Sequence, residues 1–317
     1  MRTRLIRSSS DLVPRTGHLS STLEASHTSV LLQEAIDNLS IRSHDTVVDA
    51  TLGGAGHARA IANKLDGSGT LVGFDLDADA IERARTSLNG VMPKTFCIEA
   101  NFRDIERELE AAGIDGIDKV LFDLGWSAYQ LEAGRGFSFL KDEPLLMTFS
   151  KDPKLSASTI VNEWGEESIA DIIFGWGEER YSRRIAHVIV ERRKDRPFTS
   201  SIELADAIRS AVPAAYRHGR LHPATRTFQA LRIATNDELG ALKDGLAGAW
   251  KLLRPGGRIA VITFHSIEDR IAKEVMLGYE RSGEGKRITR SPIKPTREET
   301  VSNPRARSAK LRVIEKL

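Results

Sequence analysis

Four short apolar segments alternate with helical stretches in the first half of the sequence, and this alternation limits the fold more than any other feature. The segments are TVVDAT (46–51), TLVGFDLD (70–77), KTFCIEAN (94–101) and KVLFDLG (119–125). Each ends in a polar residue or a glycine, which is typical of buried parallel strands. Between them, stretches such as residues 77–88 have helical spacing and a polar outer face. The sequence therefore predicts an α/β fold with a doubly wound, mostly parallel sheet.

The alternation stops between residues 129 and 223, where the sequence contains helical segments and loops but no pair of strands. It resumes with a helix, a strand and a final edge strand, at 225–253, 257–266 and 309–317. One discontinuous domain that carries the sheet is therefore expected over 27–128 and 224–317. We predict that residues 129–223 form an inserted all-helical subdomain that recognises the substrate.

Residues 1–26 precede the first strongly patterned segment and are rich in Arg and Ser. They are expected to form a disordered N-terminal tail. Three origins are open: a natural extension, an organelle transit peptide, or a remnant of cloning suggested by the protease-site-like sequence LVPR. None of these origins affects the fold predicted for the rest of the chain.

The overall charge says little about partners, because 46 Lys and Arg residues stand against 44 Asp and Glu residues. Hydrophobic residues make up 40% of the chain, yet no apolar run approaches the length of a membrane span. We therefore expect a cytoplasmic protein with no membrane role. The single cysteine, Cys97, rules out a disulfide framework and a cysteine metal site. His218, His222 and His265 each stand apart from other metal ligands in the sequence, so no metal requirement is predicted.

A glycine-rich turn follows the first predicted strand and is the main candidate for a ligand site. Gly53, Gly54 and Gly56 let the backbone approach a ligand closely, and the helix that begins near His57 presents unpaired N–H groups. Asp75 ends the second strand about 20 residues later, where a carboxylate can accept both hydroxyls of a ribose. These features suit NAD and S-adenosylmethionine equally, although G-G-A-G is not the usual dinucleotide spacing.

Further groups follow the third and fourth strands. Asn101 and Phe102 come after the third strand, and Asp123, Gly125 and Trp126 come after the fourth. Ligands of open α/β sheets lie outside the carboxyl ends of the strands, so these residues are expected to converge on one crevice. Phe102 is a candidate to flank an adenine ring, with a core aromatic as the alternative. Asp123 directly follows an apolar run, a costly position for a carboxylate without a partner or a task.

Several longer motifs resemble those of the bacterial 16S ribosomal RNA cytosine-N4 methyltransferases, the RsmH or MraW family. They span nearly everything after residue 26 and are HTSVLLQEAI (27–36), DATLGGAGH (49–57), DLGWSAYQLEAGRGFSF (123–139), GEERYSRRIA (177–186), HPATRTFQALRIATNDEL (222–239), ITFHSIEDR (262–270) and NPRARSAKLR (303–312). The resemblance implies a class I methyltransferase (Rossmann-like) sheet and S-adenosyl-L-methionine as the cofactor. It also implies a cytidine in the decoding region of 16S rRNA, in the small ribosomal subunit, as the substrate. A homodimer is compatible with it.

The resemblance further implies positions for the cofactor contacts. Carried over motif by motif, these are Ala55, Gly56, His57, Asp75, Phe102, Asp123 and Gln130. Two groups of positions depart from the family pattern. They are Trp126, Ala128 and Tyr129 after the fourth strand, and Leu146, Thr148 and Ser150 of the segment PLLMTFS, which replace an acid, a base and an acid. Substrate contacts are altered there if this segment shapes the target pocket.

The exocyclic amine of cytosine is a weak nucleophile because its lone pair is delocalised into the ring, so an acceptor must be positioned beside it. Asp123 is the predicted catalytic acceptor, although the resemblance also gives it a cofactor contact. Trp126 is predicted to stack on the extruded base, and His265, at the end of the fifth strand, to line the target pocket. A hydrogen-bonded structural role is the alternative for His265.

Clusters of basic residues are predicted to contact the phosphates of RNA. They are Arg180, Arg183 and Arg184; Arg192, Arg193, Lys194 and Arg196; Arg217, His218 and Arg220; and the C-terminal tail 281–312. The alternative is a solvated helix face, which we expect for part of the segment 180–194.

Three other functions remain open. A nicotinamide-dependent oxidoreductase would use the same glycine turn and Asp75. A non-catalytic RNA-binding protein of ribosome assembly would keep the fold without turnover, as the altered segment PLLMTFS suggests. Methylation of DNA is the third, but the sequence contains no duplex-reading motif.

Overall fold

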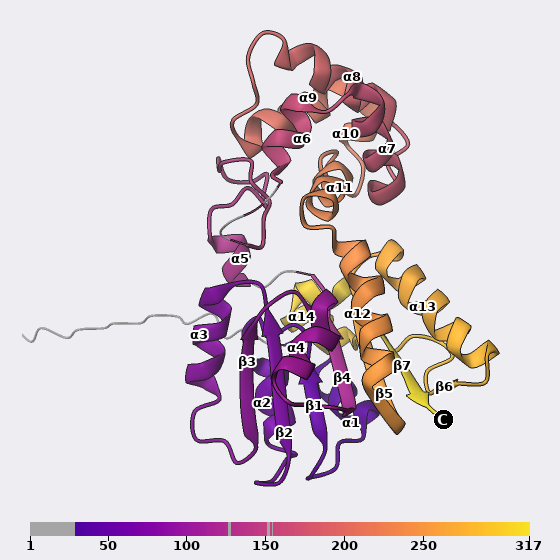
Figure 1. Ribbon diagram of the computed structural model, residues 1–317. Coiled ribbons are helices and arrows are strands. Elements are labelled where there is room, and N and C mark those ends of the chain that lie inside the picture. The colour runs from indigo at the N-terminus through magenta and orange to yellow at the C-terminus, as the bar shows by residue number, and fades with distance from the viewer. Residues whose placement is uncertain (1–28, 126–127, 151–152, 154) are drawn as a thin grey trace, which may run out of the picture.

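The computed structural model describes residues 29–125, 128–150, 153 and 155–317, so the predicted N-terminal tail lies outside the described residues. Its centre is a seven-stranded sheet with the order β3-β2-β1-β4-β5-β7-β6 (Figure 1). The strands are β1 (Thr46–Asp49), β2 (Thr70–Asp75), β3 (Lys94–Glu99), β4 (Ile117–Asp123), β5 (Leu253–Thr263), β6 (Gly285–Arg287) and β7 (Lys310–Lys316). The pairs among β1 to β5 are parallel, and β7 runs antiparallel to β5 and β6. The predicted doubly wound, mostly parallel sheet is confirmed.

Two details of the strand prediction are wrong. The last strand was expected at the edge of the sheet, but β7 lies between β5 and β6, because residues 285–287 form a three-residue strand outside it. The fifth strand begins at Leu253 rather than at residue 257, since Leu253 pairs with Ile117 before the register shifts. Both differences depend on pairings with distant residues.

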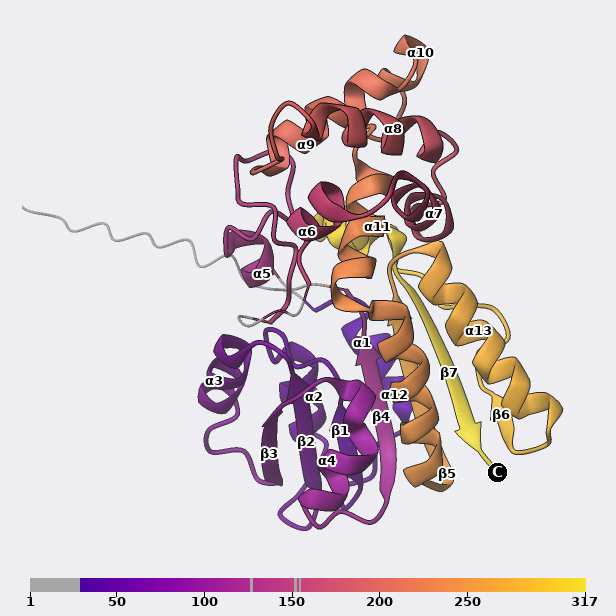
Figure 2. The same ribbon diagram turned by 45° about the horizontal axis from the view of Figure 1, so that its top comes forward.

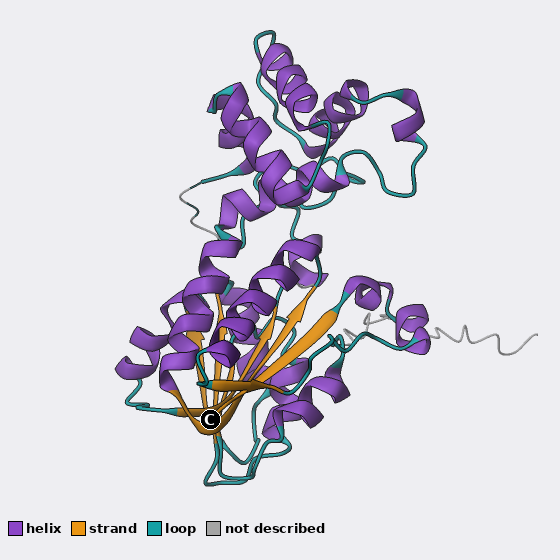
Figure 3. Ribbon diagram, turned by 90° about the vertical axis from the view of Figure 1, so that its right-hand side faces the viewer, coloured by secondary structure: helices purple, strands orange, loops and turns teal. Residues whose placement is uncertain are grey.

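Helices cover both faces of the sheet (Figure 3). One face carries α1 (Leu32–Leu39), α2 (Gly56–Ala62) and α3 (Ala78–Ser87), and the other carries α4 (Ile105–Ala111), α12 (Glu238–Leu252) and α13 (Ser266–Arg281). Successive residues of a strand point to opposite faces, so Val47 packs against the first group and Val48 against the second. Because both faces are covered, the central strands are continuous apolar runs rather than alternating ones.

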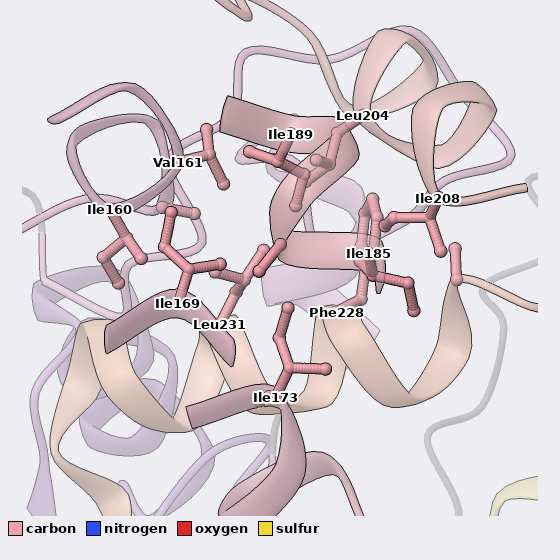
Figure 4. Packing of buried hydrophobic residues seen from close by; sticks show 14 of the residues in the cluster. Ile160, Val161, Ile169, Ile173, Ile185, Ile189, Leu204, Ile208, Phe228 and Leu231 are labelled. Carbon is pink, nitrogen blue, oxygen red and sulfur yellow. The ribbon is translucent and has the colours of Figure 1, made fainter. Parts of the chain in front are cut away.

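A second body, built of helices, stands beyond the carboxyl ends of the parallel strands (Figures 1 and 2). Helix α5 (Ala128–Glu132) links it to the sheet body. Its own helices are α6 (Ala157–Glu163), α7 (Glu166–Gly177), α8 (Ser182–Arg193), α9 (Ser201–Ala211), α10 (Ala214–Arg217) and α11 (Thr225–Asn236). Figure 4 shows the core that this body has of its own, in which Ile169 and Ile173 of α7 pack with Ile185 of α8 and Leu231 of α11. Helix α11 begins after residue 223, yet it packs in this core. The predicted domain boundary at residue 223 therefore stays a prediction.

The helix expected over 225–253 is two helices, because the chain turns at Asp237. This residue has a φ of 48°, which ends α11 and begins α12. Two further links tie the helical body to the sheet body, since Glu178 at the end of α7 accepts hydrogen bonds from Ser266 and Arg270 of α13, at 2.6 and 2.7 Å. The two bodies are therefore joined by polar contacts as well as by the chain.

The remaining elements are short, namely η1 (Phe102–Asp104), α14 (Arg297–Ser302) and η2 (Pro304–Ser308). The C-terminal pair folds back over the start of the described chain, where Glu299 Oε1 accepts a hydrogen bond from the N–H of Leu31 at 2.7 Å. This brings residues near 305 to the carboxyl end of the sheet. Within the described residues, no helix combines the length and the apolar character needed to span a bilayer.

Candidate functional site

A cavity of about 450 Å³ opens at the carboxyl ends of the parallel strands. Its walls come from the segment before α1, the glycine turn, the ends of β2 and β4, α5 and the C-terminal segment. Asp75, Asn101, Phe102, Asp123 and Gly125 all line it, as the sequence predicted for one crevice. The volume lies in the range of sites that bind small molecules and cofactors.

The glycine turn presents its backbone to this cavity. Gly53 has a φ of 48°, and its N–H donates to Asp75 Oδ2 at 2.8 Å. The N–H of Asp77 donates to the other oxygen of Asp75 at 2.9 Å, so backbone amides fix the direction of this carboxylate. Burial raises the pKa of Asp75, and these two hydrogen bonds oppose that rise. Gly54 also lines the cavity beside Gly53.

The second half of the turn packs against the segment that precedes α1. A Cβ on Gly56 would clash with the hydroxyl of Ser29, and both residues line the cavity. His57 lines it too, although the residue is only 4% exposed. Ala55 has a φ of 60° and is buried in the core, and it is not among the residues that line the cavity. Its predicted contact with a cofactor stays a prediction.

Two acidic side chains flank His57 below the cavity. His57 Nδ1 lies 3.4 Å from Asp123 Oδ2, and His57 Nε2 lies 3.1 Å from the carbonyl oxygen of Val30. Asp49 is fully buried, and its Oδ1 accepts a hydrogen bond from the N–H of Thr51 at 3.1 Å. Burial raises the pKa of Asp49 to about 7, with His57 opposing the rise. Burial disfavours the imidazolium form of His57, but Asp123 and Asp49 together raise the pKa of His57 above its usual value.

The carboxylate of Asp123 has one oxygen left for a ligand. The backbone N–H of Asp123 donates to Thr51 Oγ1 at 2.8 Å, which fixes the end of β4 against the end of β1. Its Oδ1 is buried and has no hydrogen-bond partner among the described residues, while the residue lines the cavity. Buried polar atoms are normally hydrogen-bonded. The geometry therefore fits a ligand that offers an N–H donor at this point.

Phe102 and Gln130 both line the cavity, and their predicted contacts with a cofactor stay predictions. The ring of Phe102 also packs edge-on against Phe122, with 5.5 Å between ring centroids, so this residue is both a core aromatic and a wall of the site. Gln130 is buried on α5. The stacking role predicted for Trp126 falls on a residue outside the described part of the chain.

His265 does not line the cavity. It is the N-cap of α13, where its side chain accepts a hydrogen bond from the N–H of Glu268 and Glu268 accepts one from the N–H of His265. This is the structural role that the sequence left open, and its predicted catalytic role stays a prediction. The expectation that His265 stands apart from other metal ligands is wrong, because Glu268 and Glu238 offer oxygens within 4.8 Å of it. Arg232 already binds both oxygens of Glu238, at 2.7 and 2.8 Å.

Among the residues that the site prediction omitted and that line the cavity, three come from outside the sheet and its glycine turn. They are Phe149 of the altered segment PLLMTFS, Thr225 at the start of α11 and Arg305 of η2. Each lies in or near a motif that carries the family resemblance or departs from it, which is the signal that was available in the sequence. Their side chains reach the cavity only because the helical body and the C-terminal segment fold over the sheet.

The basic clusters differ in how much of their charge the protein itself uses. Arg192 and Arg193 donate to the carbonyl oxygens of Glu203 and Val161, and Arg196 pairs with Glu203. Such residues are partly committed to the fold. The predicted contacts of these clusters with RNA stay predictions.

Three comparisons relate the chain to known proteins. The sequence profile of the MraW methylase family matches residues 24–317. A protein of Brevibacillus brevis called Ribosomal RNA small subunit methyltransferase H is 46% identical over 312 residues, which cover 93% of this chain and 99% of the relative. Proteins of the same name from Paenibacillus sp. and Clostridioides difficile are 45% and 43% identical, and cover 92% and 93% of this chain and 99% and 100% of those relatives.

Proposed function

This chain belongs to the MraW methylase family, and from that premise we propose that it is an S-adenosylmethionine-dependent methyltransferase. The proposed substrate is the exocyclic N4 of a cytidine in the decoding region of 16S ribosomal RNA. The names of the relatives support a ribosomal RNA of the small subunit, and the motif resemblance supports the base and the atom.

The charged residues around the cavity are the observation that supports S-adenosylmethionine, rather than NAD, as the cofactor. Asp75 and Asp123 line it and Asp49 lies below it, whereas Arg305 is the only Lys or Arg among its described lining residues. The pyrophosphate of NAD carries two negative charges and would lie on the glycine turn, next to these carboxylates. S-adenosylmethionine instead brings a sulfonium and an ammonium, which these carboxylates attract. The acidic cavity therefore favours the methyl donor over the dinucleotide that the sequence left open.

The cofactor contacts follow from this placement. Asp75 would accept the ribose hydroxyls, Phe102 would flank the adenine, and the backbone from Gly53 to His57 would face the methionine end. Gln130 would close the cavity from α5. When bound, the cofactor supplies an electrophilic methyl group on its sulfonium.

Asp123 is the proposed acceptor for the target amine. A hydrogen bond from the amine to Asp123 Oδ1 would favour the tetrahedral nitrogen that attacks the methyl group. Trp126 is proposed to stack on the base, and His265 to act on the target site through Glu268, which lines a smaller recess next to the cavity. A single-stranded cytidine would avoid the cost of opening a duplex, a few kcal/mol.

Mass spectrometry of small-subunit RNA from cells with and without this protein tests the proposal. We expect a methyl group on cytosine N4 that is missing without the protein, and an unchanged RNA would contradict it. In vitro, Asp123→Asn separates the two roles of this residue. Normal turnover at saturating cofactor with weakened cofactor binding would sink its catalytic assignment.

A non-catalytic ribosome-assembly protein is the second candidate, because the altered segment PLLMTFS borders the site. Phe149 of this segment lines the cavity, and Thr148, in place of the family's base, is buried. Binding of small-subunit RNA without transfer of a tritiated methyl group would support this candidate. Calorimetry with NADH and S-adenosylmethionine separates both from an oxidoreductase.

A further inference from the structure

Three acidic groups lie together at the floor of the cavity. Asp49 and Asp123 flank His57, and Asp75 lies at the neighbouring strand end. We infer that Asp49, His57 and Asp123 form a proton-exchanging network through which the site distinguishes the sulfonium form of its cofactor from the uncharged thioether left after methyl transfer. This inference rests on the proposed function, because it takes S-adenosylmethionine as the ligand.

The hydrogen bonds of His57 require a proton between this residue and Asp123. The carbonyl oxygen of Val30 can only accept, so His57 Nε2, at 3.1 Å, is the nitrogen that carries a hydrogen. In a neutral imidazole the other nitrogen, Nδ1, is then a lone-pair acceptor. Nδ1 faces Asp123 Oδ2 at 3.4 Å, and two acceptors do not attract each other. One proton therefore resides on His57 Nδ1 or on Asp123 Oδ2.

A second exchangeable proton resides on Asp49. This carboxyl is fully buried, and its Oδ2 has no hydrogen-bond partner among the described residues. An unpaired buried carboxylate is strongly disfavoured, so it takes up a proton unless a cation lies near. Within the network, the positive charge that acts on Asp49 is that of His57, and Asp123 interacts with the same imidazole.

The charges that act on Asp49 are those of His57, Asp123 and Asp75. Asp75 adds a negative charge from β2; its two oxygens accept backbone N–H groups, and Arg83 of α3 acts on it as a positive charge. Arg305 of η2 lines the cavity from the C-terminal segment. In the absence of ligand, burial, which outweighs the opposing effects of His57 and the Thr51 N–H, raises the pKa of Asp49 to about 7, so that this carboxyl is about half protonated at neutral pH.

A bound sulfonium replaces this proton as the balancing positive charge. Binding of S-adenosylmethionine is thus expected to release up to about half a proton from Asp49 at pH 7, and binding of S-adenosylhomocysteine to release fewer. By linkage, the ratio of the two affinities changes up to about tenfold per pH unit in favour of S-adenosylmethionine as pH rises. The methyl transfer itself removes the sulfonium charge, which returns the network to its protonated state and weakens retention of the product.

Isothermal titration calorimetry of the full chain at pH 7, in buffers of different ionisation enthalpy, counts the protons released. We expect a larger count for S-adenosylmethionine and for sinefungin, which carries an amine in place of the sulfonium, than for S-adenosylhomocysteine. Asp49→Asn should bind all three ligands with equal counts. The control Asp171→Asn, an exposed position on α7, should keep the wild-type difference.

Equal proton counts for the three ligands in the wild type would overturn the inference, as would a difference that persists in Asp49→Asn. If Asp49→Asn does not fold, the wild-type affinity ratio between pH 6 and 8 decides, since a flat ratio refutes the network and a rising one supports it. Failure of the proposed function looks different. If the proposed function is wrong, S-adenosylmethionine does not bind. If instead the ligands bind and RNA is methylated but the proton counts are equal, only the inferred network is refuted.

Discussion

Gly245 of α12 lets the helix approach the ring of Phe102, and replacing it with alanine tests whether this contact shapes the cavity. A Cβ at this position would lie 2.7 Å from Phe102 Cδ2 and 3.2 Å from the Phe102 carbonyl oxygen. Ordinary contact begins at 3.4 Å, so the ring must move by about 0.7 Å. Its other neighbour, Phe122, is fully buried, and the ring is therefore expected to shift toward the cavity that it lines.

The energy of this change is the sum of two opposing effects. Alanine in a helix interior is more stable than glycine by about 1 kcal/mol, while overpacking of this kind costs about 1–3 kcal/mol. Gly278→Ala on α13 is the matched control, because a Cβ there has no neighbour within 4 Å. We expect Gly278→Ala to be stabilised and Gly245→Ala to fall below it by about 1–3 kcal/mol.

Urea unfolding measures the difference in stability, and calorimetry with S-adenosylmethionine measures the effect on the site. Gly245→Ala should bind the cofactor more weakly than the wild type, and Gly278→Ala should bind it equally well. The reasoning is refuted if the two variants are equally stable and bind with the same affinity, because Phe102 would then be free to move without consequence.

Three other changes test the buried charges and the contact between the bodies. Asp49 keeps its proton to about pH 7 in the folded protein but loses it near 3.8 when unfolded, so stability falls as pH rises between these values. This fall in the free energy of unfolding amounts to at most roughly 4 kcal/mol, and urea unfolding should show that Asp49→Asn removes it. A pH profile of stability that is the same in Asp49→Asn and the wild type would contradict this expectation. Arg232→Met leaves Glu238, whose side chain is only 12% exposed, without its partner and should lower the free energy of unfolding by roughly 3–5 kcal/mol. An unchanged free energy of unfolding would contradict this expectation. Glu178→Gln breaks the partly exposed pair with Arg270, so the free energy of unfolding should change by less than about 1 kcal/mol. The kcat/KM for RNA should fall, and an unchanged kcat/KM would show that this link does not matter.

The groups at the cavity that follow strands were predictable, because their positions are set locally. Asp75 and Asp123 each end an apolar run, and the carboxyl ends of parallel strands meet at one rim whatever the rest of the chain does. The glycine turn was recognisable for the same reason. What local pattern does not give is the direction of a side chain, and so the partnership of His57 with Asp123 emerged only from the packing of α2 against the segment before α1.

Most of the parts that sequence reasoning missed depend on contacts between distant segments. Arg305 lies in a motif that carries the family resemblance, but the motif does not indicate a cavity, since its place at the site follows from the C-terminal segment folding back onto the chain near Leu31. The turn at Asp237 was missed because a continuous helical pattern runs through it, and a single residue with φ of 48° interrupts that pattern. The place of β7 inside the sheet was likewise set by a three-residue strand too short to be recognised by periodicity.

The methyl donor and the proposed RNA place opposite electrostatic demands on this protein. Carboxylates below the cavity attract a sulfonium, but the same charges repel a phosphate that approaches within a few ångströms. The ribose-phosphate backbone must therefore stay outside the cavity, and only the uncharged base can enter it. Phosphate contacts are left to the outer basic residues; within the part of the chain that the structure describes, Arg305 is the one that reaches the cavity wall. If this division holds, added salt should weaken binding of RNA far more than binding of S-adenosylmethionine, because exposed charge pairs are screened over about 10 Å at 0.1 M ionic strength and buried ones are screened much less.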